Sequence, residues 1–400
     1  GIKCLNETLI EACKKHKPDM VGLSGLLVKS AQQMVKVTMD FKASGLDLPI
    51  LVGGAALTES FTAVKIATEY DGPVLYCKDV MSGLATANQL INVETREDWL
   101  IEHRKKQTEL RAIANAPKST EPEALLPRIV YDHSQIQAKA SQFDPTIVTA
   151  GFDEIWPYIN QQMLYSGHLG VKGSISKILE KETDQHKKVV ESVEKIRTQI
   201  AREKLMTAKA VYQFFKVRAD GNDLVILDQD GQTERQRFNF LRQAGRRQQC
   251  LTDFIKPGEI DEVCFFVLTC GNEVAEKASQ LLADGNYFDS HCFSAIALEM
   301  AEGFAEMIHQ RIRSEWQIPD PENMSVQDLY KLKYTGLRVS FGYPACPNLD
   351  DQGKLWTLLN PTDAIGVDLS DEFMMSPEAS VSALVFHHPQ AKYFKIKEEA

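Results

Sequence analysis

The sequence predicts two folded parts of different class, an α/β part with a parallel sheet and an α+β part with a mainly antiparallel sheet and long helices. In residues 1–113, short apolar runs alternate with helical patterns, which is typical of right-handed parallel crossovers. In residues 146–400, β-forming runs meet at a turn, and a long amphipathic pattern follows them. Residues 114–145 contain four prolines and little periodicity, so we expect an extended, exposed linker between the two parts.

The first part is expected to alternate helices with strands. Helical patterns cover 7–17, 30–43, 58–70 and the charged stretch 88–113, and candidate strands cover 20–25, 49–55 and 73–77. The first two strands end on small residues, at Ser24 and at Gly53 and Gly54. Ligands of parallel sheets bind beyond these carboxyl ends, so small side chains there leave room for a thick ligand. The glycine motifs that bind phosphate are absent, and a glycine pair alone is also typical of a plain turn.

The second part is expected to combine an antiparallel sheet with long helices. Candidate strands cover 210–217, 223–227, 233–241, 264–269 and 380–386, and helices are expected over 175–206, over 290–316 and from residue 355. Along 290–316, apolar residues at helical spacing form a core face. The other side carries four charged residues, which we interpret as a solvated stripe: Glu299, Glu302, Glu306 and Arg313.

Composition and charge narrow the classes of protein. A net charge of −10 and a pI near 5.5 make a nucleic-acid partner unexpected. None of the eight cysteines forms a C-x-x-C motif, so we expect free thiols in a reducing compartment and no zinc ribbon. No apolar run is long enough to span a membrane and no signal peptide is seen, so we expect a cytoplasmic protein. The chain begins without Met and is expected to be a piece of a longer protein.

One loop carries the most specific pattern, R-x-x-x-G-Y-P-A-C-P over residues 338–347. The planar fork of Arg338 suits a carboxylate, and Gly342 lets the backbone approach a ligand closely. Pro344 and Pro347 restrict the backbone, so a stiff loop is expected that can hold a small zwitterion with a flat ring. The shorter pattern R-x-x-x-G-Y by itself is also typical of a rigid surface loop.

The longer string resembles the S-adenosylmethionine-binding loop of the cobalamin-dependent methionine synthase family. Residues 21–30, 50–55 and 72–76 are similar to the second half of the B12-binding domain of that family. The resemblance implies that 1–113 is the C-terminal part of a flavodoxin-like, cobalamin-binding sheet, followed by a linker (114–145) and an activation domain (146–400). The first two strands and the D-x-H-x-x-G motif, whose histidine binds cobalt in the family, are missing, so no metal ligand or catalytic residue is assigned.

The resemblance also implies two sets of binding residues. For cobalamin they are Ser24, Val28, Gly53, Gly54 and Val80. For S-adenosylmethionine they are Glu154, Glu302, Arg338, Gly342, Tyr343, Ala345, Tyr393 and Phe394. Arg338 is expected to clamp the methionyl carboxylate, Glu302 to face the sulfonium, and Tyr343 to shape the methyl pocket. Two positions depart from the family: Val28 replaces a hydroxyl of some members, and Ile155 replaces an Asp before Trp156, so the ammonium is assigned to Glu154.

The function implied by the resemblance is that of the C-terminal part of a 5-methyltetrahydrofolate–homocysteine methyltransferase. This part carries the reductive reactivation of cob(II)alamin with S-adenosylmethionine as methyl donor. The implied cofactors are cobalamin (methylcobalamin) and S-adenosylmethionine, with zinc only in the absent homocysteine module. The implied partners are a flavodoxin-like electron donor and the missing N-terminal folate and homocysteine modules. The alternatives are an isolated S-adenosylmethionine and corrinoid-binding module with no turnover, and a non-catalytic interaction protein.

Overall fold

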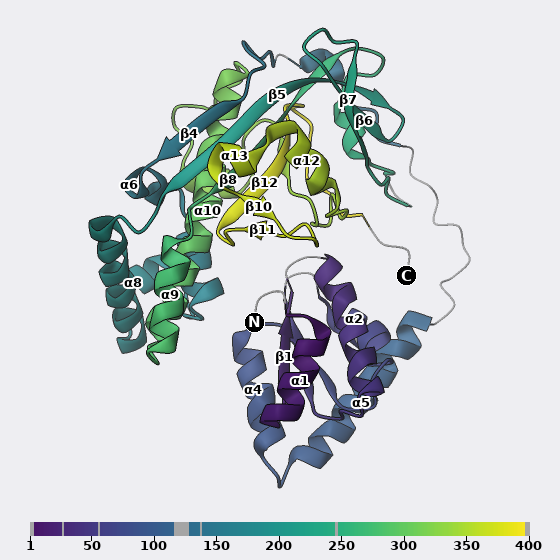
Figure 1. The fold of residues 1–400 in the computed structure, drawn as a ribbon, viewed down its shortest axis with the longest axis vertical. Helices are drawn as coiled ribbons and strands as arrows, with labels where there is room; N and C mark the ends of the chain where they lie inside the picture. The colour runs from purple at the N-terminus through teal and green to yellow at the C-terminus, as the bar shows by residue number, and fades with distance from the viewer. Residues whose placement is uncertain are drawn as a thin grey trace. The chain divides into compact units, whose positions relative to one another are not determined.

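The computed structural model describes residues 4–25, 28–54, 57–115, 128–136, 138–244 and 247–396. The chain forms two compact units, residues 1–124 and residues 125–400, each of which is described by itself (Figure 1). Within the described ranges, no helix combines the length and the apolar character that a membrane crossing requires.

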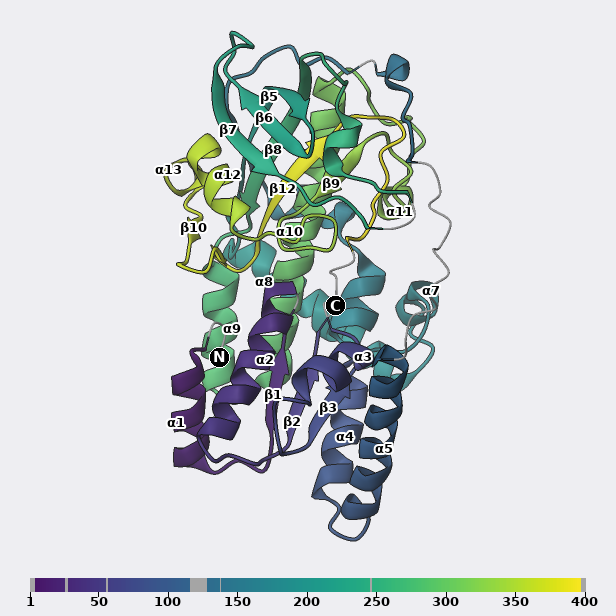
Figure 2. The ribbon, with the colours of Figure 1, turned by 90° about the vertical axis from the view of Figure 1, so that its right-hand side faces the viewer.

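The first unit is built on a three-stranded parallel sheet, as predicted. Strands β1 (Val21–Ser24), β2 (Ile50–Gly53) and β3 (Val74–Cys77) lie side by side in that order. Helices accompany them on both sides in Figure 2: α1 (Asn6–His16), α2 (Val28–Ala43), α3 (Glu59–Phe61), a π-helix (Thr62–Ile66), α4 (Val80–Ile91) and α5 (Arg96–Asn115). Phe41, Ile50, Val52 and Ile66 are fully buried in the core of this unit.

The single helix predicted over 88–113 is wrong, because two helices meet there. Asp79 begins α4 with a capping box, its side chain accepting a hydrogen bond from the Ser82 amide at 2.7 Å. The chain leaves helical geometry at Asn92 and starts α5 at Arg96. The charged pattern therefore describes α5, and the predicted boundary missed the cap.

The second unit is built on a seven-stranded antiparallel sheet, also as predicted. The strand order is β7 (Glu234–Asn239), β6 (Asp223–Leu227), β5 (Ala208–Asp220), β8 (Asp261–Thr269), β12 (Ser380–Phe386) and β9 (Leu337–Val339), with β4 (Thr146–Ala150) also on β5. Every pairing in this sheet is antiparallel. Val263 to Leu268 of β8 are fully buried, because helices cover both faces of the sheet.

The helices of this unit form two layers around the sheet. In Figures 1 and 2, α10 (Tyr287–Glu315) runs along one face, whereas α12 (Asp351–Leu359) and α13 (Pro361–Ile365) lie on the other. The remaining elements are α6 (Phe152–Ile155), α7 (Ile175–Leu179), α8 (Asp184–Glu203), α9 (Glu273–Ala283), α11 (Val326–Tyr330), the short strands β10 (Asp368–Leu369) and β11 (Met375–Ser376), and 3₁₀- or π-helices at His133–Gln135, Trp156–Tyr158, Met163–His168 and Leu251–Phe254.

The predicted exposed linker differs from the structure over its second half. Residues 128–136 and 138–145 pack on the second unit, where Ala140 is buried and its amide donates to Glu262 at 2.8 Å. The carbonyl of Phe143 accepts a hydrogen bond from Gln213 at 2.7 Å. This segment is not an exposed linker because its apolar side chains and backbone groups contact the sheet. The proline content alone did not indicate these contacts.

The solvated stripe predicted on α10 is wrong for three of its four residues. Glu299 and Glu306 are each 4% exposed and Arg313 is 1% exposed. Each has a partner from a distant or following segment: His168 contacts Glu299 at 2.9 Å, Arg338 contacts Glu306, and Asp320 contacts Arg313. Burial of charged groups requires such partners, and their positions are set by the fold rather than by helical spacing.

Candidate functional site

The loop after β9 is closed by two backbone hydrogen bonds. The Gly342 amide donates to the Cys346 carbonyl, and the Cys346 amide donates to the Tyr343 carbonyl, both at 2.8 Å. Gly342 has a φ of +83°, a left-handed conformation that side chains disfavour. Ala345 and Cys346 are buried, whereas Tyr343 is 38% exposed. The predicted stiff loop is therefore present, anchored by its apolar side and presenting the phenol outward.

Arg338 lies between this loop and helix α10. Its Nη2 donates to Glu306 Oε1 at 2.9 Å and lies 3.7 Å from Glu302 Oε2. The Arg338 side chain is 14% exposed and that of Glu306 is 6% exposed. Burial lowers the pKa of Arg338, but Glu306 and Glu302 outweigh burial and hold this pKa above its usual value. The result is a desolvated cation held by one carboxylate, with a second carboxylate beside it.

Glu302 differs from Glu306 in being open to solvent. Its side chain is 53% exposed, although its pKa is raised, mainly because surrounding protein displaces water. Arg338 opposes this shift, whereas Glu299 and Glu306 add to it. Because half of the side chain meets water, the effect is smaller than for an enclosed carboxyl. Glu302 is thus the accessible anion of the group.

A polar cluster lies next to Arg338, formed by the buried Glu306, His309 and Arg313 and the half-buried Tyr330 and Tyr334. His309 is fully buried, and neither ring nitrogen has a hydrogen-bond partner among the described residues. Its ring lies edge-on to Tyr334 at 4.7 Å, and the Arg313 guanidinium lies 4.3 Å from the same ring. Burial, reinforced by Arg313 and Arg338, lowers the pKa of His309, which keeps the imidazole neutral.

This cluster was missed by sequence reasoning. Glu306, His309 and Arg313 are spaced by three and four residues along α10, so they share one face. That spacing was a usable signal. The two tyrosines follow α10 by many residues, and nothing in the sequence indicated that they return to it. Burial raises the pKa of Tyr334 to about 12, so this phenol stays protonated.

The C-terminal segment lies beside the loop and brings Tyr393 to it. The Ile396 amide donates to the Pro344 carbonyl at 2.8 Å. Burial raises the pKa of Tyr393, and a hydrogen bond from the Ala345 backbone opposes this. Burial, then Glu302 and Tyr393, raises the pKa of Tyr343, so the two phenols and the carboxylate lie near one another. The structure therefore groups most of the predicted residues.

Phe394 and Glu154 are placed differently from the other predicted residues. Phe394 is 6% exposed and packs on Phe254 with ring centroids 6.3 Å apart, so its side chain belongs to the core. Glu154 is exposed and accepts a hydrogen bond from the Gly151 amide at 2.7 Å, which caps the start of α6. The elements α6 and Trp156–Tyr158 pack against α10, and the Tyr158 hydroxyl donates to Gln310 at 2.8 Å.

The predicted cobalamin residues lie at the carboxyl edge of the parallel sheet. Gly54 has a φ of +121°, and an added Cβ would lie 2.0 Å from the Gly25 carbonyl oxygen. Backbone packing at the strand ends therefore already requires a glycine there. Ser24 is exposed at the end of β1, with no hydrogen-bond partner for its hydroxyl among the described residues. The side chains of Val28 and Val80 lie outside the described part of the structure.

Comparison with known proteins places the chain in a family. Residues 151–399 match the family model described as vitamin B12 dependent methionine synthase, activation domain. The chain belongs to this family. It is 32% identical to the methionine synthase of Mycobacterium tuberculosis and 30% identical to that of Mycobacterium leprae, in each case over 99% of its length. It spans only 36% of the length of each of these relatives.

A solved structure is also similar to this chain. The crystal structure of the MetH reactivation domain bound to AdoHcy matches with a TM-score of 0.63 and 28% identity. The match covers 67% of this chain and 86% of that one. The family membership predicted from the loop is therefore confirmed, together with the mainly antiparallel class of the second unit. Within the described ranges, no group of three His, Cys, Asp or Glu side chains is arranged to hold a metal ion.

Proposed function

We propose that the second unit binds S-adenosylmethionine beside Arg338 and supplies it as methyl donor for the reductive reactivation of cobalamin in a methionine synthase. The observation that carries this proposal is the desolvated guanidinium of Arg338, held by Glu306 at 2.9 Å and adjacent to the exposed Glu302 and to Tyr343. AdoHcy in the structural relative supports a ligand of the same chemical family here.

The charges of the site complement this ligand. Arg338 contributes one positive charge, and Glu302 and Glu306 contribute two negative charges, which leaves one net negative charge (1 − 2 = −1). S-adenosylmethionine carries one net positive charge, because its sulfonium adds to a zwitterionic amino acid. We assign the methionyl carboxylate to Arg338 and the sulfonium side to Glu302, where opposite charges in a partly desolvated site attract strongly.

The remaining predicted residues take supporting parts in the proposal. The backbone around Val339 and Ala345 reads the adenine, Gly342 lets the backbone approach the ligand closely, and Tyr343 shapes the methyl pocket. Tyr393 borders the adenosine, and the buried Phe394 fixes the backbone on which Tyr393 is carried. To receive the ammonium, the Glu154 carboxylate has to give up the hydrogen bond from the Gly151 amide that caps α6.

The first unit is proposed to hold part of the cobalamin. An exposed hydroxyl at the carboxyl edge of a parallel sheet fits a hydrogen bond to a ligand group, so Ser24 would hold the nucleotide tail beside Gly53, Gly54, Val28 and Val80. When bound, cobalamin supplies the cobalt that accepts the methyl group. The chain's own task is to bind, orient and exclude water from the donor.

Other parts of the proposed activity lie outside this chain. Because the relatives are much longer, we infer that further modules of the same polypeptide bind folate, homocysteine and zinc. A flavodoxin-like donor in the cytoplasm would provide the electron. The partial coverage of the relatives also supports a second candidate, a binding module that has no turnover of its own.

Calorimetric titration of the chain with S-adenosylmethionine tests the site. Arg338→Ala should weaken binding by about 1.5–3 kcal/mol, because a charged contact to the carboxylate is lost. Arg338→Lys separates loss of charge from loss of the planar fork. Arg218→Ala, at an exposed position near the end of β5, is the matched control and should bind normally. Absence of saturable binding by the unmodified chain would refute the proposal.

A further inference from the structure

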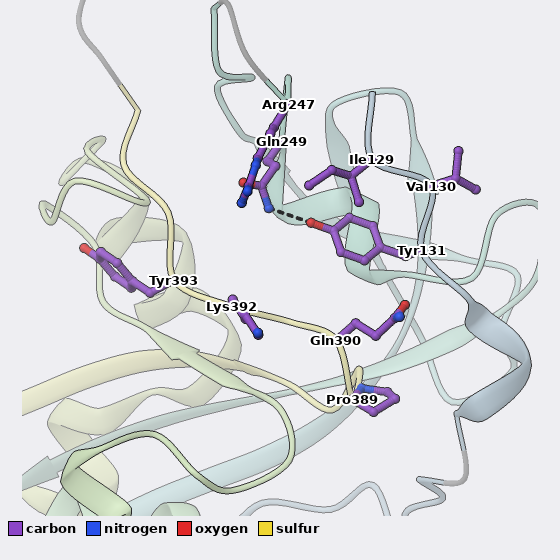
Figure 3. Close-up of a pocket in the computed structure, with 9 residues that line it drawn as sticks. All are labelled: Ile129, Val130, Tyr131, Arg247, Gln249, Pro389, Gln390, Lys392 and Tyr393. Carbon is purple, nitrogen blue, oxygen red and sulfur yellow. Dashed lines mark hydrogen bonds between the residues drawn. The ribbon is translucent and has the colours of Figure 1, made fainter. Parts of the chain in front are cut away.

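A cavity of about 480 Å³ lies in the second unit between three segments that are distant in sequence. Figure 3 shows Ile129 and Tyr131 from the segment before β4, Arg247 from the turn after β7, and Pro389 and Lys392 from the C-terminal segment. Its volume is within the range of sites that bind small molecules. None of the residues that carry the proposed S-adenosylmethionine site lines this cavity except Tyr393.

The charges around the cavity favour an anion. Its lining includes Arg247 and Lys392 and no carboxylate, in a chain whose net charge is −10. Among the described residues, neither of these two side chains has a hydrogen bond or an ion pair. The nearby acid Asp253 is already neutralised, because Arg242 donates to it at 2.7 and 2.9 Å and Arg128 also contacts it. Within the part of the chain that the structure describes, two cations therefore line the cavity without a counter-charge.

The walls of the cavity are held in place before any ligand arrives. Arg247 and Gln248 both have left-handed φ values, of 73° and 46°, which residues with side chains adopt only under constraint. Arg242 holds this turn by donating to the Gln248 carbonyl at 2.7 Å. Gln249 is 8% exposed and donates to the Tyr131 hydroxyl at 2.6 Å, the contact drawn in Figure 3.

Part of the lining of the cavity is apolar. Ile129 and Pro389 contribute aliphatic surface, and the Tyr131 ring is fixed by an edge contact with Phe254 at 5.1 Å between centroids. We propose that this cavity binds a small organic anion, with its charged group between Arg247 and Lys392 and its apolar or aromatic body against Ile129, Tyr131 and Pro389. A lining that combines two cations with apolar and aromatic side chains favours such an amphipathic ligand.

This site is separate from the proposed S-adenosylmethionine site, whose net charge has the opposite sign. Tyr393 stands between them, because it lines the cavity and its hydroxyl bonds to the Ala345 backbone. In Figure 3 its hydroxyl points away from Tyr131 and Lys392. The cavity is therefore on the other side of the C-terminal segment from the loop of Arg338.

Titration of the full chain with phenyl phosphate tests the proposal, with inorganic phosphate and phenol as the two halves of the probe. We expect saturable binding of phenyl phosphate that is tighter than that of either half. Arg247→Gln and Lys392→Gln should each weaken it at least about tenfold, as loss of a charged contact does. Lys395→Gln, an exposed lysine three residues further on and outside the lining, should leave it unchanged.

Three outcomes would overturn the proposal. The first is that phenyl phosphate shows no saturable binding, and the second is that Lys395→Gln weakens its binding as much as Arg247→Gln and Lys392→Gln do. The third is that phenyl phosphate competes with S-adenosylmethionine and that Arg338→Ala also abolishes its binding. The last would make the cavity an extension of the other site. Normal S-adenosylmethionine binding in Arg247→Gln, measured alongside, keeps failure here distinct from failure of the proposed function.

Discussion

Two arginines with little exposure, Arg313 on helix α10 and Arg338 on β9 beside it, differ in how many hydrogen bonds they make to carboxylates. Arg313 donates to both oxygens of Asp320, through Nε at 2.7 Å and through Nη2, and lies on the Tyr334 ring. Arg338 makes one hydrogen bond, to Glu306, and lies farther from Glu302, at 3.7 Å. Nη1 has no partner among the described residues in either arginine, so the two differ in the number of hydrogen bonds to a carboxylate. We interpret the guanidinium of Arg313, which makes two hydrogen bonds to one carboxylate, as stabilising the fold. The guanidinium of Arg338, which makes one, can still donate hydrogen bonds to a ligand.

The largest effect is expected from breaking the structural pair. Arg313→Ala should lower the free energy of unfolding by about 3–5 kcal/mol, because Asp320 is left charged and buried. Urea unfolding measures this. In the paired variant Arg313→Met with Asp320→Leu, much of the loss should be restored. If Arg313→Ala changed the free energy of unfolding only slightly, Arg313 would not have the structural role that separates it from Arg338.

Glu306→Gln sharpens the comparison at the other arginine. The amide oxygen can still accept from Arg338, but the charge that orients the guanidinium is lost, so S-adenosylmethionine affinity should fall by about 1–2 kcal/mol. Calorimetry with Glu276→Gln, on the exposed surface of α9, provides the control. Unchanged affinity in Glu306→Gln would mean that Arg338 needs no such support.

Glu302→Gln should separate two ligands that differ by one charge. Loss of the exposed carboxylate should weaken S-adenosylmethionine by about 0.5–1 kcal/mol, and AdoHcy, which has no sulfonium, by less. The two affinities are measured on the same preparation. Equal weakening of both ligands would contradict the assignment of Glu302 to the sulfonium side.

The smallest effect concerns pH. The pKa of Glu302 is raised, first by burial, so its negative charge is lost at a higher pH than for an ordinary glutamate. Affinity for the cationic ligand should be full above this pKa and should fall as the pH drops through it. Titrations across mildly acidic pH should show this fall in the unmodified chain and a flatter profile in Glu302→Gln. A profile unchanged by the substitution would assign the titration to another group.

The sequence predicted the class of both sheets and the loop of Arg338 because these depend on local pattern. Alternating apolar runs, a tight turn at residues 220–222, and a ten-residue string are all readable in order along the chain. The start of α4 was missed because one cap at Asp79 decides it, and the boundary with α5 was missed because the chain leaves helical geometry at Asn92. The site residues near the loop came from resemblance, and their assignment to a ligand remains a prediction.

Only the tertiary structure decided which charges are buried. Helical spacing on α10 placed Glu299, Glu306 and Arg313 on one face. It could not show whether that face meets water or partner side chains, which in the structure are His168, Arg338 and Asp320. Partners of a buried charge come from segments far away in sequence, so their presence depends on the packing of the whole unit. The same is true of the cavity at Arg247, whose walls meet only when three separate segments fold together.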